Sequence, residues 1–210
     1  MKLPKHFPAL AIALLLPTVS WAITFQLGNN PQPGEENVLL NNGTTGMLVT
    51  GITNQTGFVI NFTSTQVLSE PSSGQARIEA TNNSSQVALA NVSFSLANGG
   101  TFDDAIFNMF IGATIGSPSN ATITAVANDG TFQFTTALGN GSNFLTVFAS
   151  GGEVINSISI DASSGFTDLR QVRISGATAP TAVPDSGTTL ALLGSGLLAL
   201  ALIRRKETRA

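Results

Sequence analysis

The side chains of this chain that are best suited to chemistry are carboxylates in predicted loops. Asp103 and Asp104 are adjacent, and Asp129 lies in the turn sequence at residues 128–130. Loop carboxylates and backbone carbonyls are the ligands that Ca²⁺ takes in proteins. These three residues are therefore candidate Ca²⁺ ligands, although the spacing typical of an EF-hand loop is absent from the sequence. The sequence indicates no other cofactor.

Two carboxyl groups on either side of a sugar are also the machinery of a glycoside hydrolase. Asp103 or Asp104 could form such a pair with Asp129, Asp161 or Asp168. Glycan hydrolases usually add aromatic platforms, however, and beyond its first 22 residues the chain contains no Trp or Tyr. A carboxylate-dependent glycan hydrolase is thus the least favoured of the functions considered.

The remaining catalytic side chains are missing or lie in one short segment. Cys is absent, and His6 and Trp21 are the only residues of their types. Nucleophilic triads and Cys-His pairs depend on His or Cys, and zinc, copper and haem sites use the same side chains. If the N-terminal segment is removed, none of these chemistries remains, and we expect a protein that is not an enzyme.

The charges of the central segment have one dominant sign. Residues 23–183 contain ten acids and only three basic residues, Arg77, Arg170 and Arg173, which gives a formal charge of −7. A surface of this sign repels nucleic acid, so we expect no nucleic-acid partner. Arg170 and Arg173 have opposite parity in a predicted strand and are expected on opposite faces of it, as solvated charges or as partners of Asp168 and Asp161.

The N-terminus has the three parts of a secretory signal peptide. Lys2 and Lys5 precede an apolar run at residues 7–16. The segment ends in a small-x-small sequence, in which Ser20 and Ala22 are the two small residues. The apolar run is shorter than the ~20 residues of a membrane span. We predict a signal-peptide helix over residues 1–22 that signal peptidase cleaves after Ala22.

The C-terminus combines a short motif, an apolar helix and a basic cluster. A linker at residues 178–187 ends in Val183, Pro184, Asp185, Ser186 and Gly187. The 16 residues at 188–203 carry no charge and, as a helix, would measure ~24 Å, which is a short membrane span. The tail at 204–210 begins with Arg204, Arg205 and Lys206, which favour the cytoplasmic side and leave the preceding domain outside.

This tripartite end resembles the PEP-CTERM class of bacterial sorting signals, in the variant that carries VPDSG. The resemblance covers about 25 of the 210 residues, from the motif that begins at Val183 to the basic cluster. It implies a precursor held transiently in the inner membrane and processed there by an exosortase, with cell-surface or secreted protein as the product. Pro184 also keeps Val183 extended, which suits a peptide that a membrane protease must reach.

The segment 23–177 is predicted to be one all-β domain, a jelly-roll-like antiparallel β-sandwich. Apolar residues alternate with Ser, Thr and Asn at period two, and Gly-containing turns separate the runs. The inward-facing sets are Phe58, Ile60 and Phe62; Val92, Phe94 and Leu96; Phe132 and Phe134; Leu145 and Val147; Ile158 and Ile160; Val172 and Ile174. Residues 105–111 are apolar on both faces, which predicts a strand in the middle of a sheet.

These observations favour an exported surface or extracellular-matrix protein with a structural or interaction role. The alternative is a secreted carbohydrate- or calcium-binding module of the extracellular polysaccharide. Without Trp or Tyr, carbohydrate binding would depend on Asn, Asp and backbone groups. Asn-x-Ser/Thr triplets at Asn54 and Asn120 leave glycosylation open as well.

Overall fold

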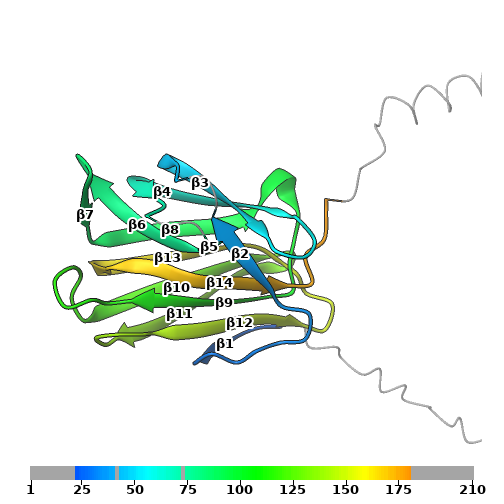
Figure 1. The fold of residues 1–210 in the computed structure, drawn as a ribbon. Helices are drawn as coiled ribbons and strands as arrows, with labels where there is room; N and C mark the ends of the chain where they lie inside the picture. Colours follow the sequence, from blue (N-terminus) through cyan, green and yellow to red (C-terminus); the bar gives the residue numbers. More distant parts are fainter. Residues whose placement is uncertain (1–21, 41–42, 72–73, 181–210) are drawn as a thin grey trace, which may run out of the picture.

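The computed structural model describes residues 22–40, 43–71 and 74–180, which form an all-β body with a large antiparallel sheet (Figure 1). The strands are β1 (Ala22–Leu27), β2 (Glu36–Leu40), β3 (Thr45–Thr53), β4 (Val59–Ser69), β5 (Gly74–Gln75), β6 (Arg77–Asn82), β7 (Ser85–Val87), β8 (Leu89–Leu96), β9 (Asp104–Phe110), β10 (Ser119–Ala127), β11 (Gly130–Leu138), β12 (Phe144–Ser150), β13 (Ile155–Phe166) and β14 (Asp168–Ser175). One 3₁₀ turn, η1 (Ala97–Gly99), follows β8.

The sheet folds over on itself into two layers. Its strand order is β1-β12-β9-β14-β2-β3-β4-β8-β13-β10-β11. Strands β1, β12, β9 and β14 form the β9 layer, and strands β3, β4, β8, β13, β10 and β11 form the β8 layer. Strand β2 joins them, because its first residues pair with β14 and its later ones with β3. Strand β6 bridges β14 and β4 in the same way.

The core between the layers is built on Phe side chains that the alternating pattern turns inward. Phe94 of β8 lies at its centre, with ring centroids 5.9 Å from Phe62, 6.3 Å from Phe102 and 5.6 Å from Phe107 of the opposite layer. All four side chains are at most 1% exposed. Where β1 and β11 leave the sheet open, a second stacked pair, Phe25 and Phe134, packs across the gap at 5.5 Å.

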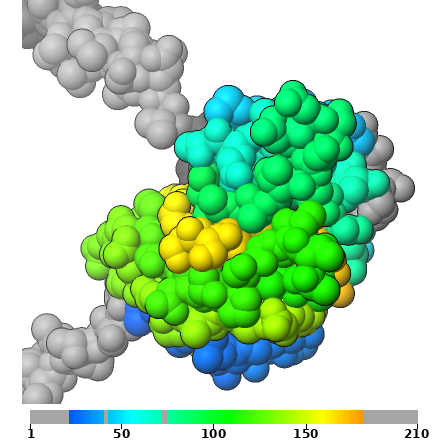
Figure 2. Space-filling model, turned by 90° about the vertical axis from the view of Figure 1, so that its left-hand side faces the viewer, coloured from blue at the N-terminus to red at the C-terminus, as the bar shows by residue number. Residues whose placement is uncertain are grey.

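Both ends of the described chain leave the body at one end, which we call the tail end. Ala22 pairs with Ser150 at the start of β1, and Thr178 pairs with Thr101 just beyond η1. Figure 1 shows the two ends on the same side of the body. Figure 2 looks at the opposite, far end, where the segment after β9 (green) lies against the link from β13 to β14 (yellow).

Most strand predictions are confirmed, and one is wrong. Strand β9 is flanked by β12 and β14 and is buried on both faces, as its continuous apolar run indicated. Arg170 and Arg173, however, lie on the same face of β14. They pair with Asn108 and Ile106, which have equal parity, because a bulge with Gln171 at φ 53° inserts an extra residue between them.

Some finer predictions are not tested by the described residues. The antiparallel all-β architecture is present, whereas the jelly-roll connectivity stays a prediction. The signal-peptide helix before Ala22 and the membrane helix at 188–203 lie outside the described residues.

Candidate functional site

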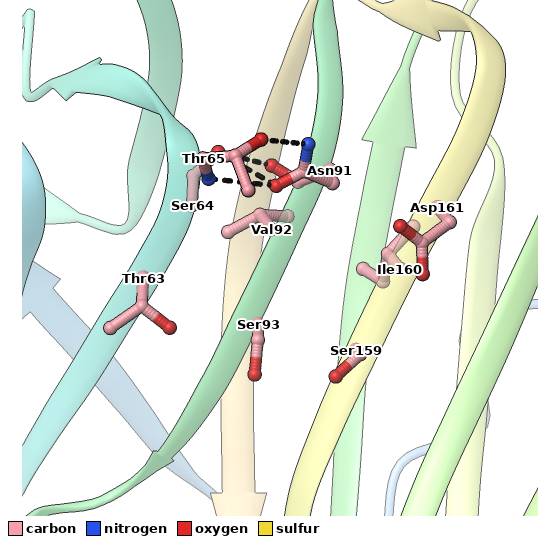
Figure 3. Close-up of a pocket in the computed structure, with 9 residues that line it drawn as sticks. All are labelled: Thr63, Ser64, Thr65, Asn91, Val92, Ser93, Ser159, Ile160 and Asp161. Atoms are coloured by element: carbon pink, nitrogen blue, oxygen red, sulfur yellow. Dashed lines mark hydrogen bonds between the residues drawn. The ribbon is translucent and has the colours of Figure 1, made fainter.

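A polar groove lies on the outer face of the β8 layer, where β4, β8 and β13 run side by side (Figure 3). It has a volume of about 290 Å³ and is lined by residues 63–65, 91–93 and 159–161. Val92 and Ile160 are buried in the core, so the polar residues on either side of them in the sequence line the outer face.

The groove forms because β4 leaves β8 part of the way along it. The two strands pair only from Ile60 to Thr63. Beyond that point β4 bulges, since it has four residues between its pairs with Leu48 and Gly46, where β3 has one. Side chains then replace the strand pairing, and the space between the strands widens into the groove.

Asn91 holds the upper wall of the groove in place. Its Oδ1 accepts hydrogen bonds from the Ser64 hydroxyl at 3.0 Å and from the Thr65 N–H at 3.0 Å. Its Nδ2 donates to the Thr65 hydroxyl at 2.7 Å, and its carbonyl oxygen accepts from the Ser64 hydroxyl at 2.7 Å. Four bonds between the same three residues fix this wall.

The remaining polar side chains of the groove make no hydrogen bonds to the other residues that line it (Figure 3). Thr63, Ser93 and Ser159 pair with one another across the three strands and form one row. Asp161 lies two residues beyond Ser159 and is exposed. Figure 3 shows no hydrogen bond between these four side chains and the others that line the groove. Asp161 is the only charged residue of the lining.

The predicted Ca²⁺ ligands lie in different settings. Asp104 begins β9, is 6% exposed and accepts a hydrogen bond from the Ser175 hydroxyl, while its Oδ1 has no partner. Burial, together with the nearby charges of Glu35 and Asp103, raises the pKa of Asp104 to about 6 despite the Ser175 bond. The Asp103 carboxylate lies instead against Gly176.

Asp129 occupies the β10–β11 turn, where its N–H donates to Glu153 Oε1 at 2.9 Å. Glu153 is 3% exposed and its Oε2 has no partner. Nothing in the sequence distinguishes Glu153, because its burial depends on two loops that are 24 residues apart. Among residues 22–40, 43–71 and 74–180, no three His, Cys, Asp or Glu side chains are grouped as metal ligands, so Asp103, Asp104 and Asp129 do not form one site.

Asp168 and Asp161, two of the carboxylates considered for a hydrolase pair, lie in separate surroundings. Asp168 is fully buried and binds both Arg170, through two hydrogen bonds, and Arg77, at 3.3 Å. The Arg170 guanidinium also lies 3.7 Å from the centroid of the Phe110 ring. Asp168 therefore binds two arginines on the outer face of β14, and its predicted pairing with Arg170 is confirmed. Asp161 is the only carboxylate among the residues that line the groove. Arg173 pairs with Glu35 at 2.9 Å rather than with Asp161.

The residues of the predicted signal peptide and of the predicted C-terminal sorting signal lie almost entirely outside the described part of the chain. Ala22, which begins β1, and residues 178–180 of the linker are described. Ser20, the motif at residues 183–187 and the basic cluster of Arg204, Arg205 and Lys206 lie outside the described residues. No helix in the described ranges has the length and apolar character needed to cross a membrane.

Comparison with known proteins identifies the C-terminal segment. A family model described as the VPDSG-CTERM motif matches residues 182–206. No curated protein and no solved structure matches the chain. The match includes the five motif residues, the apolar stretch and the basic cluster in the predicted order, and such a motif implies an exported surface protein that an exosortase processes. Residues 182–206 of this chain are therefore a VPDSG-CTERM sorting signal of the PEP-CTERM type.

Proposed function

We propose that this chain is a non-enzymatic surface or extracellular-matrix protein, whose β domain is exported, paused in the inner membrane by residues 188–203 and processed at residues 183–187. The observation that carries the proposal is the sorting motif at residues 182–206. In this scheme signal peptidase removes residues 1–22 and the exosortase acts on the other end. The inner membrane is a transient partner.

The position of the termini supports this order of events. Ala22 and Thr178 lie at the tail end of the body, so one end of the domain faces the membrane while the precursor is held there. The far end then points away from the lipid, and the outer face of the β8 layer forms a side of the body. The domain can thus fold and meet extracellular partners before the tail is processed.

The distribution of the acidic residues supports a binding or structural role rather than hydrolysis. Glycoside hydrolysis requires two carboxyl groups that face each other across a sugar. Asp161 is the only carboxylate that lines the groove, and Asp168 is fully buried in ion pairs with two arginines. A hydrolytic mechanism has no second carboxylate at this groove.

A carbohydrate-binding role in the extracellular polysaccharide is the second candidate. The polar groove favours it, because three hydroxyl side chains and a carboxylate face solvent there. The one observation that supports a calcium-binding role is that Asp104 and Glu153 each have a buried carboxylate oxygen without a hydrogen-bond partner.

Substitution of the motif tests the sorting proposal. Pro184→Ala combined with Asp185→Ala should leave an unprocessed precursor in the membrane fraction of cells that contain a matching exosortase. Pro180→Ala, which changes the linker outside the motif, is the control and should be processed like the natural chain. Normal release of the double variant, or unchanged release of the natural chain from cells without the exosortase, would contradict the proposal.

A further inference from the structure

We propose that the groove between β4, β8 and β13 is a binding site for a neutral saccharide. This inference deepens the carbohydrate-binding role described above and does not depend on processing of the tail. It rests on four properties of the groove: a fixed wall, a row of free hydroxyls, a single negative charge and a position clear of the tail end.

The fixed wall lowers the cost of binding. The Asn91 side chain is held by three hydrogen bonds to Ser64 and Thr65, all between 2.7 and 3.0 Å. Gln66 extends the wall, since it donates to the Ala88 carbonyl at 2.9 Å and accepts from the Ala90 N–H at 2.7 Å. Side chains that are already ordered lose little conformational freedom when a ligand arrives.

The free groups form a regular array on the sheet. Thr63, Ser93 and Ser159 are paired residues of neighbouring strands, so they lie ~4.8 Å apart along one row. Asp161 is two residues from Ser159 on the same strand and therefore ~7 Å away. Figure 3 shows the three hydroxyl-bearing side chains in this row and the Asp161 carboxylate beside it.

The chemistry of these groups matches a hydroxyl-rich ligand. Ser and Thr hydroxyls both donate and accept hydrogen bonds, as sugar hydroxyls do. A carboxylate accepts only, and its hydrogen bonds from hydroxyl donors are about twice as strong as those between neutral groups. Apolar ligands find little to contact, because Val92 and Ile160, the two apolar residues of the lining, are at most 1% exposed.

The charge of the groove selects among saccharides. Asp161 carries the only charge of the lining, and none of the lining residues is Lys or Arg. Uronic acids, sulfated sugars and phosphates would therefore meet a like charge without a compensating cation. One carboxylate is also too few for a typical Ca²⁺ site, which takes six to eight oxygen ligands. A neutral saccharide fits this single charge and the row of hydroxyls beside it.

The groove stays accessible while the domain is held by its tail. Strand β13 begins at Ile155 on the tail end, and Ser159 lies four residues along it, which corresponds to ~13 Å. The groove opens on the side of the body at that height. Saccharide binding can thus precede or follow processing of the tail.

Binding of the secreted, folded protein to an array of neutral and uronic-acid oligosaccharides tests the proposal, followed by titration calorimetry on the best neutral binder. Asp161→Asn should weaken that binding about tenfold or more, as expected for hydrogen bonds to a charged group, and Ser159→Val should weaken it about threefold to tenfold, as expected for a neutral hydroxyl. Asp129→Asn removes the same charge outside the groove and Thr135→Val removes a hydroxyl from a neighbouring part of the same face; both should bind like the natural protein.

Equal melting temperatures of the variants show that lost binding is not lost folding, because the substituted side chains lie on the outer face. The proposal is overturned if the array detects no neutral saccharide, if anionic sugars bind best, or if both groove variants bind as tightly as the controls. None of these results bears on processing of the tail, which is measured separately with the Pro184 and Asp185 variants.

Discussion

Asp104 should make the stability of the domain fall as the pH rises, and Asp104→Asn should remove that dependence. The side chain is 6% exposed at the start of β9, and its Oδ1 has no hydrogen-bond partner. Burial and the charges of Glu35 and Asp103 outweigh the hydrogen bond from Ser175, so the pKa is raised from 3.8 to about 6. The asparagine side chain keeps the shape of the carboxyl group and cannot ionise.

The sign and the size of the effect follow from the shift. A raised pKa means that the folded state holds the proton of Asp104 more tightly than the unfolded state does. The stabilisation is complete below the unfolded pKa and is lost as the pH rises through about 6. The rise of the Asp104 pKa from 3.8 to about 6 corresponds to ~3 kcal/mol of unfolding free energy in total, of which ~2 kcal/mol is lost between pH 4 and pH 7.5.

Urea unfolding of the natural protein and the variant across this pH range measures the effect. Other carboxylates also titrate there, so the informative quantity is the difference in unfolding free energy between Asp104→Asn and the natural protein. That difference should shift in favour of the variant by ~2 kcal/mol from pH 4 to pH 7.5. Asp129→Asn, in an exposed turn, should show no comparable trend. A difference that is constant with pH, or that shifts against Asp104→Asn, would refute the reasoning.

Two further substitutions test the packing of the core. Phe94→Ala should lower the unfolding free energy by ~3–5 kcal/mol, because the ring is fully enclosed by three others, whereas Phe132→Ala at the half-buried edge should cost less. Gly51→Ala should cost ~1–3 kcal/mol, since its Cβ would lie 2.5 Å from Val38 Cγ1. Gly139→Ala, whose Cβ would meet only Asn143 Oδ1 at an ordinary contact distance of 4.0 Å, should be near neutral; urea unfolding measures both.

The strands could be predicted from the sequence where the pattern is local. Val92, Phe94 and Leu96 alternate with Ser93 and Ser95, and all three apolar side chains are buried in β8. The sorting motif could also be predicted from the sequence, because the signal lies in consecutive residues, 182–206.

The groove and the ion pairs between residues far apart in the sequence could not be predicted, because they depend on which strands become neighbours. Asn91 meets Ser64 across 27 positions, and Arg77 meets Asp168 across 91. The bulge at Gln171 has no recognisable sequence pattern either. It places Arg173 on the face of β14 opposite to the predicted one. Each feature follows from which strands become neighbours, which alternation alone does not specify.

Intact-mass measurement of the protein from its producing cells tests the central claim most directly. We predict a chain that begins at Ile23 and ends within residues 183–187, with or without an attached group, and a longer C-terminus in cells that lack the exosortase. Surface-exposed protein that still carries residues 188–210 in cells with an active, matching exosortase would contradict the account.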